Sequence, residues 1–270
     1  MNTDVFDVET PLVGMVHLEA LPGAPGYAND RRTVHERAVA DAEALEAGGV
    51  DGVMVENFGD APFYPDDVPK HVVAEMTTAV SAVVDAVDLP VGVNVLRNDA
   101  EAALSVAAAT GADFVRVNVH TGARVTDQGV VEGRAHETIR LRERLDTDVK
   151  LLADVDVKHS TPLGGQAFDP EVVAETVERG LADGVIVSGT GTGHAVDVDR
   201  LAAVAERSAS LDVAAPVFVG SGVTEETVAE LLDVADGAIV GTALKRDGRT
   251  TNPVDETRVS ALVEAARSRL

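Results

Sequence analysis

The segment from Asp154 to Lys158 carries the densest set of side chains able to transfer protons. Asp154, Asp156 and Lys158 stand two residues apart at the end of the apolar stretch Lys150–Val155. Side chains two residues apart in a strand point to one face, so this spacing predicts that the three lie together inside the fold, or all outside it in the opposite register. A carboxylate beside an ammonium group is suited to acid–base catalysis and equally to a structural ion pair.

Polar residues end other short apolar stretches in the same way. Glu56 ends one of them and is, with Asp154 and Lys158, a candidate for the acid–base role. Glu56, Asp154 and Asp156 also carry oxygens of the kind that Mg²⁺ binds, so magnesium stays open as a cofactor, while no metal site or other cofactor is predicted. The polar residues expected to position a substrate at these ends are Asn94, Arg97, Arg116, Asn118 and Ser188.

Two glycine-containing segments near the end of the chain predict a phosphate site. Glycine lets backbone N–H groups approach an anion closely, and hydroxyl or ammonium groups nearby add further donors. Three of the four lysines in the chain also follow apolar stretches, which favours an anionic ligand, although two tight turns would explain the glycines alone. The residues of the predicted phosphate site are Gly220, Ser221, Gly222, Gly241, Thr242 and Lys245.

The scaffold that positions these residues is predicted by a repeating pattern. Eight short, β-branched apolar stretches alternate with longer, alanine-rich stretches of helical periodicity. Apolar runs without alternation are typical of parallel strands covered on both faces. The expected strands are Leu12–Val16, Gly52–Val55, Val91–Val95, Phe114–Val119, Lys150–Val155, Val185–Val187, Val217–Val219 and Ala238–Val240.

Eight strand–helix units predict an α/β protein with a single (β/α)8 TIM barrel that occupies residues 1–270 as one domain. A doubly wound sheet is the alternative, but no GxGxxG motif follows the first expected strand. In a (β/α)8 barrel the chemistry lies at the carboxyl ends of the strands. The acid–base, substrate and phosphate candidates all fall at those ends.

Composition excludes several classes of protein. The chain of 270 residues contains no cysteine, which removes disulfides, thiolate catalysis and thiolate metal sites. Its net charge of −24 disfavours nucleic acid and anionic membranes as partners. The first residues have neither a basic nor an apolar leader, and no apolar run is long enough to span a bilayer, so we expect a cytoplasmic protein, with homo-oligomer formation open.

Aromatic residues concentrate in segments expected to be loops. Three expected loops are long for this fold, namely Phe58–Lys70, His120–Gly133 and Lys158–Phe168. In a chain with so few aromatic residues, aromatic loops indicate a lid, a stacking wall for a ring-bearing ligand, or a subunit interface. Five of the eight aromatic residues lie in expected loops, and they are Tyr27, Phe58, Phe63, Tyr64 and Phe168.

Six motifs of the chain occur in a specific combination, and they are Leu12–Gly23, Asp156–Ser160, Ser188–Gly193, Val219–Thr224, Asp236–Lys245 and Asn252–Asp255. Together they resemble the BtpA family, also called the BtpA/SgcQ family. The resemblance covers nearly the whole chain and implies a TIM barrel of the phosphate-binding kind. The family takes its name from a factor for photosystem I biogenesis in cyanobacteria, and other members lie near sugar-use genes.

Two functions remain in competition. The first is an enzyme acting on a phosphorylated sugar or nucleoside-like substrate by acid–base chemistry, through isomerisation or through cleavage or phosphorolysis at the sugar C1. The second is a noncatalytic assembly or stability factor, as the role that names the family implies. A lysine Schiff base is less favoured, because Lys158 lies just past its strand.

The charge predicts a dependence of stability on salt. Acidity is spread along the whole chain, and only four of the 22 basic residues are lysines, a composition typical of proteins from a salt-rich cytoplasm. Salt screens repulsion between carboxylates, so the midpoint of thermal unfolding is expected to be higher in molar KCl than in dilute buffer. Equal midpoints in the two buffers would contradict the interpretation.

Overall fold

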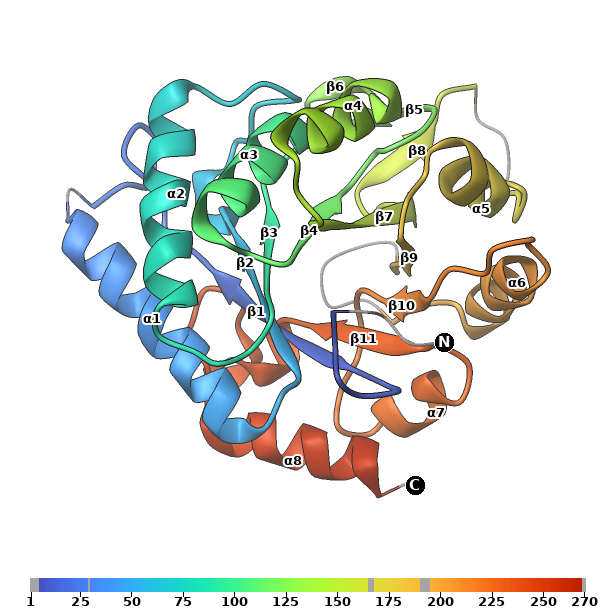
Figure 1. Cartoon of the computed structure of the whole chain (residues 1–270). Coiled ribbons are helices and arrows are strands. Elements are labelled where there is room, and N and C mark those ends of the chain that lie inside the picture. Colours follow the sequence, from blue (N-terminus) through green and yellow to red (C-terminus); the bar gives the residue numbers. More distant parts are fainter. Residues whose placement is uncertain (1–4, 29, 165–167, 190–194, 269–270) are drawn as a thin grey trace.

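Eight parallel strands close into a barrel in this computed structural model, which describes residues 5–28, 30–164, 168–189 and 195–268. The strands follow the order β1-β11-β10-β9-β7-β4-β3-β2 around the barrel (Figure 1). The predicted (β/α)8 barrel is therefore confirmed, and the doubly wound alternative is wrong because the sheet has no open edge. The barrel strands are β1 (Leu12–His17), β2 (Gly52–Glu56), β3 (Val91–Asn94), β4 (Phe114–Val117), β7 (Lys150–Asp156), β9 (Gly184–Val187), β10 (Val217–Val219) and β11 (Gly237–Val240).

Helices surround the barrel and follow its strands along the chain (Figure 1). Several begin at an aspartate whose side chain accepts a backbone N–H of the first turn, as Asp99 does from Ala102 and Asp255 from Thr257. Short 3-10 turns η1 (Phe58–Asp60), η3 (Thr242–Leu244) and η4 (Arg246–Gly248) also occur. The helices are α1 (Arg31–Gly48), α2 (Lys70–Val84), α3 (Ala100–Thr110), α4 (Ala135–Leu145), α5 (Val172–Ala174) with the π-helical turn η2 (Glu175–Arg179), α6 (Val198–Ala209), α7 (Val228–Leu232) and α8 (Glu256–Arg267).

A small antiparallel sheet lies outside the barrel. It consists of β6 (Gly129–Glu132), β5 (Ala123–Thr126) and β8 (Ser160–Pro162), in that order. These strands belong to the segments after β4 and β7 that the sequence predicted to be loops. The prediction of loops there is wrong because the hairpin β5–β6 gains hydrogen bonds from β8, which is distant in sequence.

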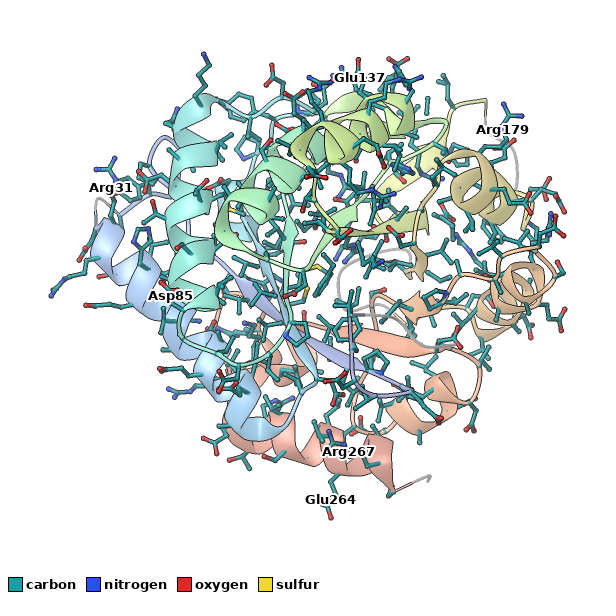
Figure 2. All side chains as sticks on the ribbon, in the orientation of Figure 1. Arg31, Asp85, Glu137, Arg179, Glu264 and Arg267 are labelled. Atoms are coloured by element: carbon teal, nitrogen blue, oxygen red, sulfur yellow. The ribbon has the colours of Figure 1, made fainter. Side chains whose placement is uncertain are left out.

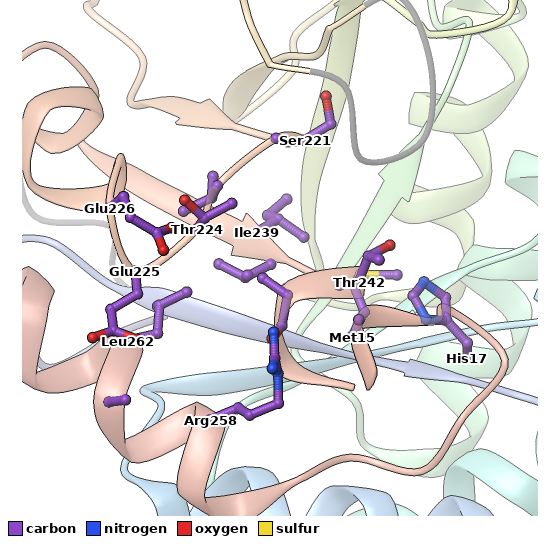
Figure 3. A pocket seen from close by; sticks show the side chains of 18 of the residues that line it. Met15, His17, Ser221, Thr224, Glu225, Glu226, Ile239, Thr242, Arg258 and Leu262 are labelled. Atoms are coloured by element: carbon purple, nitrogen blue, oxygen red, sulfur yellow. The ribbon is translucent and has the colours of Figure 1, made fainter. Parts of the chain in front are cut away.

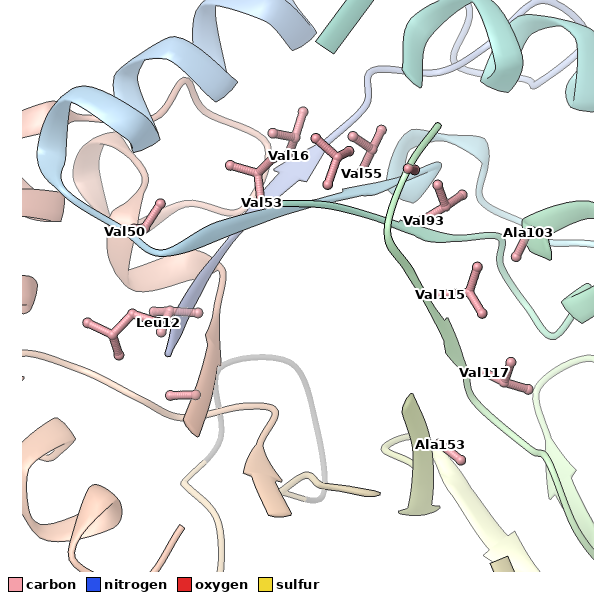
Figure 4. Close-up of a cluster of buried hydrophobic side chains, with 14 of the residues drawn as sticks. Leu12, Val16, Val50, Val53, Val55, Val93, Ala103, Val115, Val117 and Ala153 are labelled. Carbon is pink, nitrogen blue, oxygen red and sulfur yellow. The ribbon is translucent and has the colours of Figure 1, made fainter. Parts of the chain in front are cut away.

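The apolar residues of the barrel strands divide into an outer and an inner core. Outward-facing side chains such as Val53, Val93 and Val115 pack beneath the helices (Figure 4). Inward-facing side chains such as Met54, Phe114 and Ile186 fill the barrel, and Phe6 joins them from the segment before β1. Burial on both faces explains why the strand sequences are continuously apolar.

Glycines at inward positions make room for the largest rings of the inner core. A Cβ atom added to Gly92 would overlap the ring of Phe114, and one added to Gly237 would lie 2.6 Å from Phe218 Cε1. Barrel interiors are filled by layers of side chains, so small residues must face large ones. Apolar side chains thus fill the amino-terminal half of the barrel interior, and buried polar side chains such as Glu56, Asn94 and Arg116 lie toward its carboxyl-terminal end.

Charged side chains cover the outer surface of the helices. Arg31, Asp85, Glu137, Arg179 and Glu264 are exposed and project away from the barrel (Figure 2). Within the described ranges, no helix combines the length and the apolar character that crossing a bilayer requires.

Candidate functional site

A continuous row of polar side chains lines the carboxyl-terminal end of the barrel. His17, Glu56, Asn94 and Arg116 are register partners on the neighbouring strands β1, β2, β3 and β4. Because residues in register have the same orientation in a sheet, the four side chains face the barrel axis together. Glu56, Asn94 and Arg116 are buried, and His17 is nearly so.

Arg116 and Asp154 form a bidentate ion pair at the centre of this row. Arg116 Nε donates to Asp154 Oδ2 at 2.9 Å, and Nη2 donates to Oδ1 at 2.8 Å. Asn118 Nδ2 donates to Oδ2 at 3.1 Å, and the Ser188 hydroxyl donates to Oδ1 at 3.2 Å. Burial opposes the charge on Arg116, but Asp154 outweighs that effect and raises the pKa of the guanidinium. The structure thus makes Asp154 an anchor for Arg116, with both carboxylate oxygens occupied.

His17 lies beside Glu56, with 3.8 Å between His17 Nε2 and Glu56 Oε1. Its ring packs against Phe58 at a centroid distance of 4.8 Å. Burial first, and then the positive charges of Lys245 and Lys158, lower the pKa of His17 well below its ordinary value. The imidazole is therefore neutral at neutral pH. Within the described part of the chain, its buried Nδ1 atom has no hydrogen-bond partner.

The loops after β10 and β11 enclose a cavity of about 540 Å³, which we call the β10–β11 pocket (Figure 3). Arg116, Lys158 and Arg258 line it with positive charge, and Glu225 and Glu226 line it with negative charge. The structure brings five of the six predicted phosphate residues to this pocket, and these are Gly220, Ser221, Gly222, Gly241 and Thr242.

The glycines of the β10–β11 pocket have different tasks. Gly220 donates its N–H to Val187 O at 2.8 Å, and a Cβ atom there would lie 2.8 Å from Ser188 Oγ. Gly220 therefore serves the packing of the barrel. Gly222 has a φ angle of 71°, which glycine adopts without strain. The hydroxyl of Ser221 accepts the N–H of Gly189 at 2.6 Å, which joins the loops after β9 and β10.

Lys245 lies away from the pocket, in contrast to its predicted place in the phosphate site. Its side chain is fully buried, and Nζ donates to Asp41 Oδ2 of α1 at 3.2 Å. Burial lowers the pKa of Lys245 to about 8, although Asp41 acts in the opposite direction. The short turn η3 directs this lysine toward the surrounding helices, so we leave Lys245 out of the proposed phosphate site.

A second cavity of about 460 Å³ opens beside β2 and β3, and we call it the aromatic pocket. Phe58, Ala61, Phe63 and Leu96 supply its apolar lining. Its polar and charged lining residues are Glu56, Arg97, Asn118, Asp127, Lys158 and His159.

Lys158 lines both cavities and therefore lies between them. Burial first, and then the charge of Arg116, lower the pKa of Lys158 below its ordinary value. Its backbone carbonyl accepts a hydrogen bond of 2.5 Å from Arg97 Nη2. Burial also lowers the pKa of Arg97. The structure therefore brings Glu56, Arg97 and Lys158 to one place, as the sequence predicted.

Asp156 does not share a face with Asp154, in contrast to the prediction. The pairing of β7 with β9 is irregular between these two residues, so that Asp154 pairs with Ile186 and Asp156 with Val187. Such a bulge breaks the alternation of a strand. Asp156 instead forms ion pairs with Arg124 of β5 and Arg200 of α6, outside the barrel.

Sequence reasoning assigned no role to two groups that line the β10–β11 pocket. His17 carried a usable signal, because it ends the first strand. Arg258 carried none, because it belongs to α8 and reaches the pocket only through packing against the barrel. Among the residues that the structure describes, no group of three histidine, aspartate or glutamate side chains has the arrangement of a metal site.

The closed barrel with a polar carboxyl-terminal end places the chain among (β/α)8-barrel proteins. Tryptophan synthase from M. tuberculosis has a similar structure, with a TM-score of 0.61 and 21% identity over 97% of this chain and 94% of that one. Thiamine phosphate pyrophosphorylase from Pyrococcus furiosus gives a TM-score of 0.58 at 14% identity, over 97% of both chains. At such low identities the similarity concerns the fold alone.

The chain belongs to the BtpA family, whose model matches residues 8–268. It is 46% identical to the photosystem I biogenesis protein BtpA of Synechocystis sp., over 96% of this chain and 89% of that protein. It is 51% identical to an uncharacterised protein of Thermococcus kodakarensis, over 95% of both chains. The family resemblance of the sequence motifs is thereby confirmed.

The Arg116–Asp154 pair leads to a prediction about stability. Asp154→Ala leaves a buried guanidinium without its counter-charge, so the free energy of unfolding should fall by about 3–5 kcal/mol in chemical denaturation. The double variant Arg116→Met/Asp154→Leu removes both charges and should recover much of that loss. Asp85→Ala, at an exposed aspartate, is the control. An Asp154→Ala protein as stable as the wild type would contradict the anchoring role.

Proposed function

We propose that this protein is an enzyme that acts on a phosphorylated sugar or nucleoside-like substrate by acid–base chemistry. The observation that carries the proposal is the position of Lys158, which lines both the β10–β11 pocket and the aromatic pocket. A substrate with its phosphate in the first pocket would extend past Lys158 into the second. Its reacting carbon would then lie beside the ammonium group of Lys158, whose pKa is lowered by burial.

The β10–β11 pocket is the proposed phosphate site. In (β/α)8 barrels the loops after the last two strands frequently bind phosphate. Ser221 and Thr242 bring hydroxyl groups, and Arg116, Lys158 and Arg258 bring positive charge. The helix α7 that follows has only five residues, so the proposal relies on the loops and the cationic side chains rather than on a helix dipole.

Glu56, Lys158 and His17 are the proposed acid–base groups. Glu56 lines the aromatic pocket and lies 3.8 Å from His17 of the β10–β11 pocket, so this pair connects the two pockets, and Lys158 lines both of them. Isomerisation needs an acid and a base on either side of a carbon pair, and cleavage at C1 needs an acid for the leaving group. Asp154, a predicted catalytic residue, has both oxygens occupied and is proposed to position Arg116 instead.

The predicted substrate-binding residues fall into two groups in this proposal. Arg97 and Asn118 line the aromatic pocket, and Arg116 lines the β10–β11 pocket, so all three are placed to contact a substrate. Asn94 Nδ2 donates to Arg116 O at 3.0 Å and to Asn118 Oδ1 at 3.1 Å, and Ser188 binds Asp154. Asn94 and Ser188 are therefore proposed to hold the groups that touch the substrate.

A thermal-shift screen in molar KCl tests this proposal. The panel contains inorganic phosphate, pentose and hexose phosphates, nucleosides and nucleotides. A ligand that binds the folded state alone raises the unfolding midpoint, so a shift specific to phosphorylated sugars or nucleotides supports the enzyme. No shift across the panel would contradict it.

A noncatalytic assembly or stability factor is the second candidate. The observation in its favour is the 46% identity to a Synechocystis protein named for photosystem I biogenesis. This candidate expects no specific small ligand at the barrel mouth, so the same screen separates the two functions.

The phosphate assignment makes Gly222 sensitive to a negative charge. Gly222→Asp should lower the affinity for ribose 5-phosphate at least tenfold, because it places a carboxylate in the β10–β11 pocket. Gly122→Asp is a matched control, because Gly122 has a similar φ angle of 69°, has open space around it and lies outside this pocket. Isothermal titration measures both variants, and equal affinities would place the phosphate elsewhere.

The lowered pKa of Lys158 predicts a pH dependence of ligand binding. The ammonium form attracts phosphate, and a lowered pKa means that this charge is lost at a lower pH than for an ordinary lysine. The affinity for ribose 5-phosphate should therefore fall as the pH rises through the alkaline range, at a lower pH than an ordinary lysine would give, and Lys158→Arg should remove much of that fall. Lys70→Arg, at an exposed lysine, is the control. An identical pH profile for Lys158→Arg and the wild type would contradict the role of Lys158.

A further inference from the structure

The aromatic pocket has a lining unlike that of the β10–β11 pocket. Phe58 and Phe63, both half-buried, supply two of its walls, and Ala61 and Leu96 add aliphatic surface. Aromatic residues are scarce in this chain, at 3% of the sequence. The sequence left open whether the aromatic loops form a lid, a wall or an interface. For Phe58 and Phe63 the structure favours a wall, whereas Tyr64 is 50% exposed and is absent from the lining of the pocket.

Hydrogen bonds to the segments that follow β1 and β3 hold this wall in place. Gly59 N donates to Leu18 O at 3.0 Å, and Leu96 N donates to Asn57 Oδ1 at 2.7 Å. On the far side of Phe63, Arg97 N donates to Tyr64 O at 2.9 Å. The segment is thus fixed at several points to the residues that follow β1 and β3. A wall that is already in place loses little conformational entropy when a ligand binds.

Charged donors face the same cavity. Arg97 and Lys158 are cations that line it, and each presents N–H groups to an acceptor. Glu56 and Asp127 line it as well, so the pocket has no large excess of positive charge. A second phosphate would meet both carboxylates. A neutral planar group with acceptor oxygens on its edge would instead satisfy the donors and cover the phenylalanine faces.

We propose that the aromatic pocket binds a planar, carbonyl-bearing ring joined to the sugar of a phosphorylated substrate, with Phe63 as a stacking residue. The inference rests on the proposed function, since it places the phosphate in the β10–β11 pocket and the sugar beside Lys158. It narrows the substrate to a nucleotide-like N-glycoside rather than a simple sugar phosphate. The bond between ring and sugar then lies next to Glu56 and Lys158.

Binding of uridine 5′-monophosphate and of ribose 5-phosphate tests this inference, because the two differ in the ring. The wild type should bind the nucleotide about tenfold more tightly, the order of effect expected for one stacked ring. Phe63→Leu should weaken binding of the nucleotide several-fold more than binding of ribose 5-phosphate, and so lose most of that preference. Tyr64→Leu is the control and should keep the preference, since the side chain of Tyr64 is exposed and does not line the pocket. Titrations in molar KCl, with unfolding midpoints to confirm intact folding, give these values.

The possible failures are distinguishable. Equal affinities of the wild type for both compounds would overturn the ring site and leave the proposed sugar-phosphate enzyme standing. A preference for the nucleotide that survives Phe63→Leu would overturn the assignment of the ring to the aromatic pocket. If neither compound binds, the proposed function fails and this inference fails with it.

Discussion

The buried ion pair of Arg116 and Asp154 is the interaction on which the arrangement of side chains at the carboxyl-terminal end of the barrel depends. A guanidinium inside a barrel is costly unless a counter-charge and further hydrogen bonds accompany it. Asp154 supplies the charge, and Asn118 and Ser188, each directly after the end of β4 or β9, complete its hydrogen bonds. Strands that are not neighbours in sequence are thereby fixed to one another at the level where a substrate would lie. This network holds the Arg116 guanidinium at the wall of the β10–β11 pocket, with its charge paired to Asp154.

Two cavities with different chemistry meet at this network. One is lined by glycines, hydroxyl groups and cations, and the other is lined by aromatic and aliphatic surface with a few charges. Lys158 and the His17–Glu56 pair stand where the two meet. Burial lowers the pKa of both side chains, so that His17 is a neutral proton acceptor and the Lys158 ammonium gives up its proton more readily than an ordinary lysine does. The arrangement is the basis for the proposed substrate, which has a phosphate at one end and a planar ring at the other.

Much of this architecture was predictable because strand and helix periods leave a direct signature in the sequence. Continuous apolar runs predicted the eight strands, and the topology then brought Glu56, Arg116 and Lys158 to one end without further information. The bulge in β7 was not predictable, since it depends on how β9 pairs with its neighbour, and it separated Asp156 from Asp154. Lys245 was misplaced for a similar reason, because a three-residue turn decides which way its side chain points. Arg258 reaches the β10–β11 pocket because α8 packs against the barrel, and the local sequence pattern does not predict how a helix packs.

The close packing of side chains in the amino-terminal half of the barrel limits which substitutions the sequence can accept. Each inward glycine at that level lies against one large side chain, as Gly92 does against Phe114 and Gly52 against Phe6. The two residues of each pair fill one fixed volume, so a larger side chain at one position requires a smaller side chain at the other. Substitutions at these positions must arrive in compensating pairs, whereas the loops at the opposite end can vary singly. We therefore expect few single substitutions in the amino-terminal half of the barrel, and more in the loops at its carboxyl-terminal end, where they can change ligand specificity.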